Sequence, residues 1–140
     1  MNILVINGSP KSGNSNTISL TRAFLDGAGW ADVEIVDVAK AGVKDCLGCY
    51  SCWTKTPGKC VIDDGMGEIL AKLIDADVVI WSFPLYYFNV PGCLKNLIDR
   101  QLPLNMPFMA DGSKSGGHPA RYDLSRQKAC CHFYLRLLDG

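Results

Sequence analysis

The sequence predicts an α/β fold in which a parallel sheet is covered by helices on both faces. Two apolar runs, residues 3–6 and 78–81, are rich in β-branched side chains and lack the polar alternation of a half-exposed strand. Such runs are typical of strands buried on both faces. Helical patterns alternate with the strands, which favours a parallel sheet with right-handed crossovers.

The elements follow from the spacing of apolar residues and from the residues that interrupt it. Strands are expected at 3–6, 32–38 and 77–83, and a last segment at 128–138 closes the chain. Helices are expected from 17 to about 28, from Asp63 or Asp64 onward, and over 92–100. We interpret residues 1–140 as a single domain, with an inserted cysteine loop at 46–60 and an irregular segment at 101–126.

Composition excludes several classes of protein. The chain has 140 residues, 48% of them hydrophobic, and a formal net charge of zero. No basic stripe indicates nucleic acid, and no apolar run is long enough to span a membrane. The N-terminus enters a strand directly and does not resemble a signal peptide, so we expect a cytoplasmic protein. In that compartment the seven cysteines are expected to be metal ligands, redox groups or free thiols rather than disulfides.

Residues 8–16 consist only of Gly, Ser, Pro, Lys and Asn and lie between a strand and a helix. Amide N–H groups and the positive end of the helix dipole make such a loop an anion site. Gly8 and Gly13 have the glycine spacing of a P-loop, and Ser15 stands at its Ser/Thr position, but Asn14 replaces the lysine that would reach the β- and γ-phosphates. That departure disfavours a nucleoside triphosphate and favours one terminal phosphate. The alternative is a βα turn with a good N-cap and no ligand.

Residues 84–91 are unusually aromatic for a surface loop, with Tyr86, Tyr87 and Phe88 in succession. Planar side chains beside a phosphate site favour a flat heterocyclic ligand, whose polar edges Asn89 can bind. The alternative is that these rings pack under the following loop or in a subunit interface. Both loops follow strands of a parallel sheet, where ligands bind at the carboxyl ends. A monophosphate and a flat ring together describe flavin mononucleotide (FMN).

Three motifs resemble the NADPH-dependent FMN reductases and iron–sulfur flavoproteins of the flavodoxin-like superfamily: residues 8–17, residues 84–87 and Asp99-Arg100. The resemblance runs from Met1 to about Tyr122 and implies a flavodoxin-like three-layer sandwich with sheet order 2-1-3-4(-5). It implies an FMN phosphate bound by Ser9, Lys11, Asn14, Ser15, Asn16 and Thr17. It implies an isoalloxazine lying along Pro84, Leu85, Tyr86, Tyr87, Phe88 and Asn89. It further implies a homodimer or homotetramer with the flavin near a subunit interface.

The cysteine loop carries a second constellation: Cys46, Cys49, Cys52 and Cys60. Closely spaced thiolates on one irregular segment can surround an iron–sulfur cluster, whereas zinc more often takes two separated C-x2-C pairs. The resembling branch has such a motif between its second strand and second helix, which implies a [4Fe-4S] cluster. Zinc, reduced thiols and packing remain the alternatives. Cys93 lies on a predicted helix and is expected in the core.

The end of the chain departs from the family. A fourth strand, a small-residue turn and further βα units are expected, but residues 130–138 read as a cysteine-rich, aromatic segment. One allowed set of codons for this segment, read one base later, encodes Val-Val-Ile-Ser-Thr-Cys-Gly-Phe, a typical strand and turn. We therefore hypothesise a truncated or frame-shifted C-terminus after about Lys128, in which the last βα units are missing. The DNA sequence of this region tests that hypothesis.

Three hypotheses of function follow. The first is an FMN-dependent oxidoreductase that passes electrons from NAD(P)H to a small-molecule or protein acceptor, with or without the cluster, and without a catalytic side chain. The second is a non-enzymatic electron carrier of flavodoxin type, and the third is a truncated domain that holds no cofactor. His118, Arg121 and Tyr122 either close over the ligand or are solvated loop residues.

Overall fold

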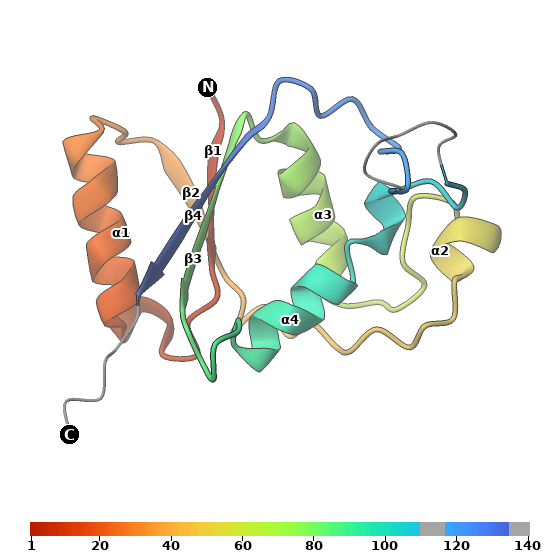
Figure 1. Cartoon of the computed structure of the whole chain (residues 1–140), viewed down its shortest axis with the longest axis horizontal. Coiled ribbons are helices and arrows are strands. Elements are labelled where there is room, and N and C mark those ends of the chain that lie inside the picture. The colour runs from red at the N-terminus through yellow and green to blue at the C-terminus, as the bar shows by residue number, and fades with distance from the viewer. Residues whose placement is uncertain (110–116, 135–140) are drawn as a thin grey trace.

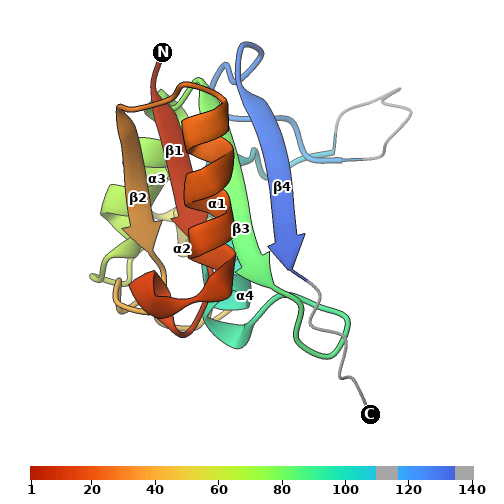
Figure 2. The same cartoon turned by 90° about the vertical axis from the view of Figure 1, so that its left-hand side faces the viewer.

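A four-stranded parallel sheet with helices on both faces forms the centre of the molecule (Figures 1 and 2). The structure is a computed structural model that describes residues 1–109 and 117–134, the side chains of 130–134 excepted. The strands are β1 (Ile3–Asn7), β2 (Val33–Asp37), β3 (Val78–Pro84) and β4 (Lys128–Tyr134). Their spatial order is β2-β1-β3-β4, and every neighbouring pair is parallel. The predicted α/β architecture and the first four positions of its sheet order are confirmed.

The helices lie in two layers (Figure 1). Helix α1 (Asn16–Gly27) covers one face of the sheet, and α3 (Met66–Asp75) and α4 (Gly92–Asp99) cover the other. The short α2 (Ser51–Thr54) lies beyond α4, and two 3₁₀ turns, η1 (Ser12–Asn14) and η2 (Leu102–Leu104), complete the elements. Among the helices that the structure describes, none is long and apolar enough to cross a membrane.

Alternate residues of the central strands enter separate cores on the two faces. Ile3 and Val5 pack in the cluster on the α1 side, whereas Leu4 and Ile6 pack with α3 and α4. Because successive side chains of a strand point to opposite faces, a strand covered on both sides needs apolar residues at every position. This requirement explains the uninterrupted apolar runs that predicted the sheet.

Two predicted details of the middle of the chain are wrong. Residues 46–60 are not irregular throughout, because α2 forms one turn after Tyr50, which has a left-handed φ of 52°. The second long helix begins at Met66 rather than at Asp63 or Asp64. Asp64 Oδ1 still accepts the Met66 N–H at 3.0 Å, so it satisfies a free amide of the first turn from outside the helix.

Two glycines at the start of α3 should respond oppositely to alanine. A Cβ on Gly65 would lie 2.3 Å from the Ala41 carbonyl oxygen, whereas a Cβ on Gly67 meets nothing within 4 Å. We expect Gly65→Ala to lower the free energy of unfolding by about 1–3 kcal/mol through overpacking against backbone. Gly67→Ala should raise it by about 0.5–1 kcal/mol, because alanine loses less conformational freedom in a helix. Urea denaturation checks both, and equal shifts for the two variants would contradict this packing.

Residues 128–134 occupy the fourth place in the sheet, where β4 pairs with β3 from Val78↔Lys128 to Pro84↔Tyr134. The unusual segment at the end of the sequence therefore extends the sheet. Residues 135–138 of the predicted closing segment lie outside the described residues. The frame-shift hypothesis remains a hypothesis.

Candidate functional site

The loop after β1 has a rigid first turn. Gly8 N–H donates to the Ser82 carbonyl oxygen at 2.8 Å, which joins the loop to the end of β3. A Cβ on Gly8 would lie 2.6 Å from Leu94 Cδ2, so only glycine lets α4 pack this closely. Ser9 is buried, and its carbonyl oxygen accepts the Ser12 N–H at 2.9 Å. The chain thus leaves the sheet in one defined direction.

The far side of this loop becomes the first turn of α1. Ser15 is the N-cap, and its Oγ accepts the Ile18 N–H at 3.1 Å. Within the part of the chain that the structure describes, no hydrogen bond engages the N–H groups of Asn16 and Thr17. Free amides at the first turn of a twelve-residue helix attract an anion, because they add to the positive end of the helix dipole. The expected anion site therefore has its donors available.

A cavity of about 160 Å³ brings the two sequence-predicted loops together. Its lining comprises the six residues predicted for the phosphate and the first three predicted for the ring: Ser9, Lys11, Asn14, Ser15, Asn16, Thr17, Pro84, Leu85 and Tyr86. Drug-sized ligands usually fill roughly 300–1,000 Å³, so this space suits the phosphate end of a cofactor rather than a whole one. These residues fit FMN if the ring lies outside the cavity, along the loop after β3.

The tip of the loop after β3 lies apart from this cavity. Tyr87 and Phe88 are 96% and 90% exposed, and both have left-handed backbone, with φ of 48° and 62°. Reciprocal backbone hydrogen bonds between Tyr86 and Asn89 close the tight turn that requires this conformation. The side chain of Asn89 accepts the adjacent Val90 N–H at 2.8 Å. These three predicted ring contacts are thus on a projecting turn.

The four cysteines of the predicted cluster lie in one region but do not form a metal site. Burial raises the pKa of the Cys52 thiol, and the neighbouring Cys60, Cys49 and Cys46 raise it further. Hydrogen bonding to Ser51 lowers the pKa of the exposed Cys49. Among the described residues, no three His, Cys, Asp or Glu side chains are arranged to hold a metal ion. Four thiols are the right donors for a cluster, but their arrangement here does not fit one.

A buried ion pair lies beside the cysteine loop. Arg100, 1% exposed, donates from Nη1 and Nη2 to the two carboxylate oxygens of Asp64, both at 3.0 Å. Arg100 Nη1 also donates to the Lys44 carbonyl oxygen at 2.9 Å, and Lys44 N–H donates to Asp64 at 3.0 Å. The pair therefore links the end of α4 to Lys44, just before the cysteine loop, and to the start of α3. The Asp99-Arg100 motif was noticed in the sequence, but its partner was not.

Aromatic contacts hold the other side of the cysteine loop. Trp53 Nε1 donates to the carbonyl oxygens of Leu102 and Asn105 at 3.1 and 2.9 Å, and its ring lies 5.0 Å from that of His118. Arg121 Nε donates to the Pro103 carbonyl oxygen at 3.1 Å. The sequence left two roles open for His118, Arg121 and Tyr122, either closure over the ligand or solvated loop residues. His118 and Arg121 pack beside the cysteine loop, and none of the three lines the phosphate cavity.

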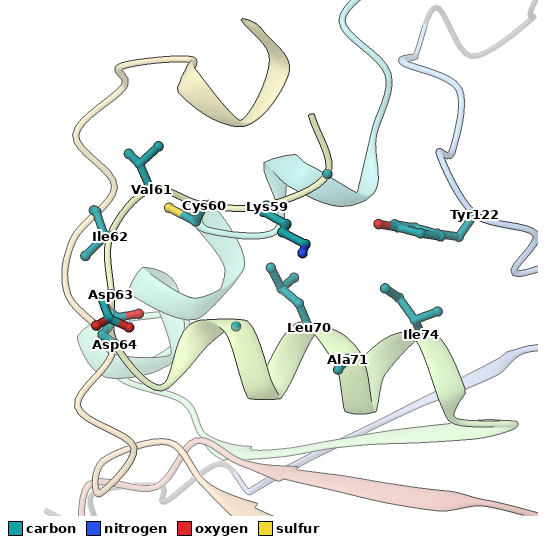
Figure 3. A pocket seen from close by; sticks show the side chains of 12 residues that line it. Lys59, Cys60, Val61, Ile62, Asp63, Asp64, Leu70, Ala71, Ile74 and Tyr122 are labelled. Atoms are coloured by element: carbon teal, nitrogen blue, oxygen red, sulfur yellow. The ribbon is translucent and has the colours of Figure 1, made fainter. Parts of the chain in front are cut away.

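A larger cavity of about 420 Å³ lies between residues 58–64 and α3, and sequence reasoning did not anticipate it. Leu70 and Ile74 of α3 form its floor, and the side chains of Lys59 and Tyr122 point toward it from opposite sides (Figure 3). No local pattern could have found it, because Tyr122 is distant in sequence from the other residues of the wall.

The parallel sheet of order β2-β1-β3-β4 and the cavity shared by the loops after β1 and β3 define a flavodoxin-like α/β protein. The model of one family, NADPH-dependent FMN reductase, matches residues 1–133. The chain belongs to this family.

Curated relatives and solved structures agree with that assignment. An iron–sulfur flavoprotein from Methanocaldococcus jannaschii is 36% identical over 119 residues, which cover 84% of this chain and 60% of the relative. An iron–sulfur flavoprotein from Archaeoglobus fulgidus is 31% identical over 130 residues, covering 84% and 62%. The chain thus spans about 60% of the length of these relatives.

The same fold occurs in a solved FMN-dependent NADH-azoreductase from Bacillus anthracis in complex with FMN. Its TM-score is 0.66 at 20% identity, covering 96% of this chain and 69% of that one. At this identity the match supports the fold alone.

Proposed function

We propose that this chain binds FMN and acts as an NAD(P)H-dependent oxidoreductase. The observation that carries the proposal is the cavity in which the loop after β1 meets the loop after β3. Membership of the NADPH-dependent FMN reductase family supports it. When bound, FMN would accept a hydride from the nicotinamide and pass on the two electrons one at a time. The electron acceptor, a small molecule or a protein, is left undefined by the site.

The chain's own residues have binding and positioning roles in this proposal. The free amides of Asn16 and Thr17 and the hydroxyl of Ser15 would hold the phosphate, with Lys11 supplying a positive charge. Pro84, Leu85 and Tyr86 would place the ring at the carboxyl edge of the sheet. The proposal assigns proton transfer to no side chain.

Binding of FMN should depend on its phosphate. We expect FMN to bind at least about tenfold more tightly than riboflavin, because several charge-assisted hydrogen bonds would be lost with the phosphate. Titration of the flavin fluorescence with purified protein measures both affinities. Equal affinities, or a folded protein that ignores FMN, would overturn the proposal.

Reduction of the bound flavin separates an enzyme from a carrier. Rapid bleaching of flavin absorbance by NADPH or NADH under anaerobic conditions supports the oxidoreductase. Reduction only by a protein partner supports an electron carrier instead.

The exposed turn that carries Tyr87 and Phe88 favours an oligomer in which a second copy of the chain lies near the flavin. Two large aromatic side chains on strained, exposed backbone are costly for an isolated surface, and such strain is typical of functional segments. We propose a homodimer or homotetramer in which Tyr87 and Phe88 meet the ring or the partner. Light scattering of Tyr87→Ser/Phe88→Ser against the parent chain tests this assembly.

For the cysteine loop we propose an iron–sulfur cluster as a second candidate, supported by the four thiols and by the names of the two relatives. Their present arrangement counts against it, so the loop would have to close around the metal. Anaerobic reconstitution with iron and sulfide, followed by a visible spectrum, tests this proposal. A spectrum with flavin bands alone, unchanged by Cys52→Ser, would exclude the cluster.

A further inference from the structure

A buried asparagine joins the phosphate loop to the edge of the sheet. Asn7 is the last residue of β1 and is 0% exposed. Its Nδ2 donates to Asp37 Oδ1 at 2.5 Å, and its Oδ1 accepts the Ser9 N–H at 3.2 Å. Asp37 ends β2, which pairs in register with β1 so that Asn7 and Asp37 are direct neighbours.

We propose that Asn7 and Asp37 are positioning residues that set the phosphate loop for FMN. This inference rests on the proposed FMN site. Neither residue lines the phosphate cavity, so neither would touch the cofactor. They would act through Ser9, which does line it and whose amide they fix in direction.

The chemistry of the pair explains why an amide stands at position 7. A carboxylate can only accept hydrogen bonds, and a backbone N–H can only donate. One side chain that serves both must carry a donor and an acceptor, as Asn does. Alanine would leave a buried N–H and a carboxylate oxygen unpaired, and Asp would place two carboxylates in contact. Among the residues that the structure describes, Asp37 has one ion-pair partner, Lys40, whose Nζ lies 3.6 Å from Asp37 Oδ2.

The pair also decides which amides remain for the phosphate. Because the Ser9 N–H points back to Asn7, it is taken from the anion site, and position 10 is a proline without N–H. The donors left in the loop are those nearer the start of α1. Without the hydrogen bond from Ser9 N–H to Asn7, the turn that follows β1 could change direction. Ser9 would then shift relative to the amide donors at the start of α1.

Four variants test the proposal through the ratio of FMN to riboflavin affinity. Asn7→Ala and Asp37→Ala should each lower that ratio roughly tenfold, since a buried hydrogen bond is lost beneath the phosphate end. Asp37→Asn keeps an acceptor for Asn7 Nδ2 and should hold the ratio within about threefold of the parent chain. Leu25→Ala, in the core under α1, is the control for lost stability and should leave the ratio unchanged.

A second measurement needs no cofactor. Amide hydrogen exchange of the unliganded protein should show faster exchange at Ser9 in Asn7→Ala and Asp37→Ala, and parent-like exchange in Asp37→Asn. Unchanged affinity ratios and exchange in the two alanine variants would overturn the positioning role while FMN binding by the parent chain stands. A parent chain that ignores FMN would overturn the proposed function, and the role toward FMN with it.

Discussion

Replacing Arg100 by Met should lower the free energy of unfolding by about 3–5 kcal/mol. The variant leaves the Asp64 carboxylate, whose side chain is 5% exposed, without its cation. Removing one partner of a buried pair costs more than removing both, because an uncompensated buried charge remains. It also releases the Lys44 carbonyl oxygen and so loosens the connector to the cysteine loop. Urea denaturation followed by tryptophan fluorescence measures the effect.

Lowering the pH should reduce the difference in free energy of unfolding between the parent chain and Arg100→Met. Burial raises the pKa of Asp64, but hydrogen bonds from Arg100 and from the amides of Lys44 and Met66 outweigh it and hold the pKa below its ordinary value. Such a group stabilises the fold above its unfolded pKa of about 3.9, and this contribution is lost as pH falls through the folded pKa. We expect this difference in free energy of unfolding to begin to decrease below about pH 5.

The matched control is the neutral double variant Asp64→Asn/Arg100→Met. It removes both charges and keeps an acceptor for Met66 N–H, so its loss should be smaller than that of Arg100→Met alone. If Arg100→Met were as stable as the parent chain between pH 4 and 8, the buried Asp64–Arg100 pair would not stabilise the fold as we expect.

Replacing Ser15 by Asp should abolish most FMN binding without harming the fold. Asp caps a helix as well as Ser does and is favourable at the positive end of the helix dipole, so α1 should form normally. The new carboxylate would lie in the cavity proposed for a phosphate. Two like charges about 4 Å apart near a protein surface repel strongly, so we expect FMN affinity to fall at least about a hundredfold.

Two comparisons make this result specific. Ser15→Asn caps α1 without a charge and should keep FMN affinity within about tenfold of the parent chain. Riboflavin has no phosphate, so its affinity should be nearly the same in Ser15→Asp and Ser15→Asn. If Ser15→Asp binds FMN as the parent chain does, the phosphate does not lie at the start of α1.

Much of the fold could be predicted because its signals are local. The apolar runs of β1 and β3 are each covered on both faces, and α3 and α4 show apolar residues at helical spacing. The errors arose where distant residues decide the outcome. Helix α3 begins at Met66, and Asp64, which accepts the Met66 N–H, is also bound by Arg100, 36 positions away. The turn α2 is held by Trp53 through carbonyl groups of residues 102 and 105.

The candidate site shows the same division. The loop composition at 8–16 predicts an anion site, and the structure brings the six residues predicted for the phosphate into one cavity with Pro84, Leu85 and Tyr86. Contact of Tyr87, Phe88 and Asn89 with the ring stays a prediction, because these residues lie on a tight turn outside the cavity lining. Assignment of the cysteines to a cluster depended on spacing, and spacing alone does not specify where the sulfur atoms point.

By itself the sequence determined the α/β class, the parallel sheet and the two loops at its carboxyl edge. These depend on periodicity and on the short-range preferences of Gly, Pro, Ser and Asn, which act within a few residues. Only the tertiary structure decided that Asn7 meets Asp37 and that Arg100 meets Asp64. Such pairings join residues 30 or more positions apart, and packing of whole elements selects them rather than any local preference.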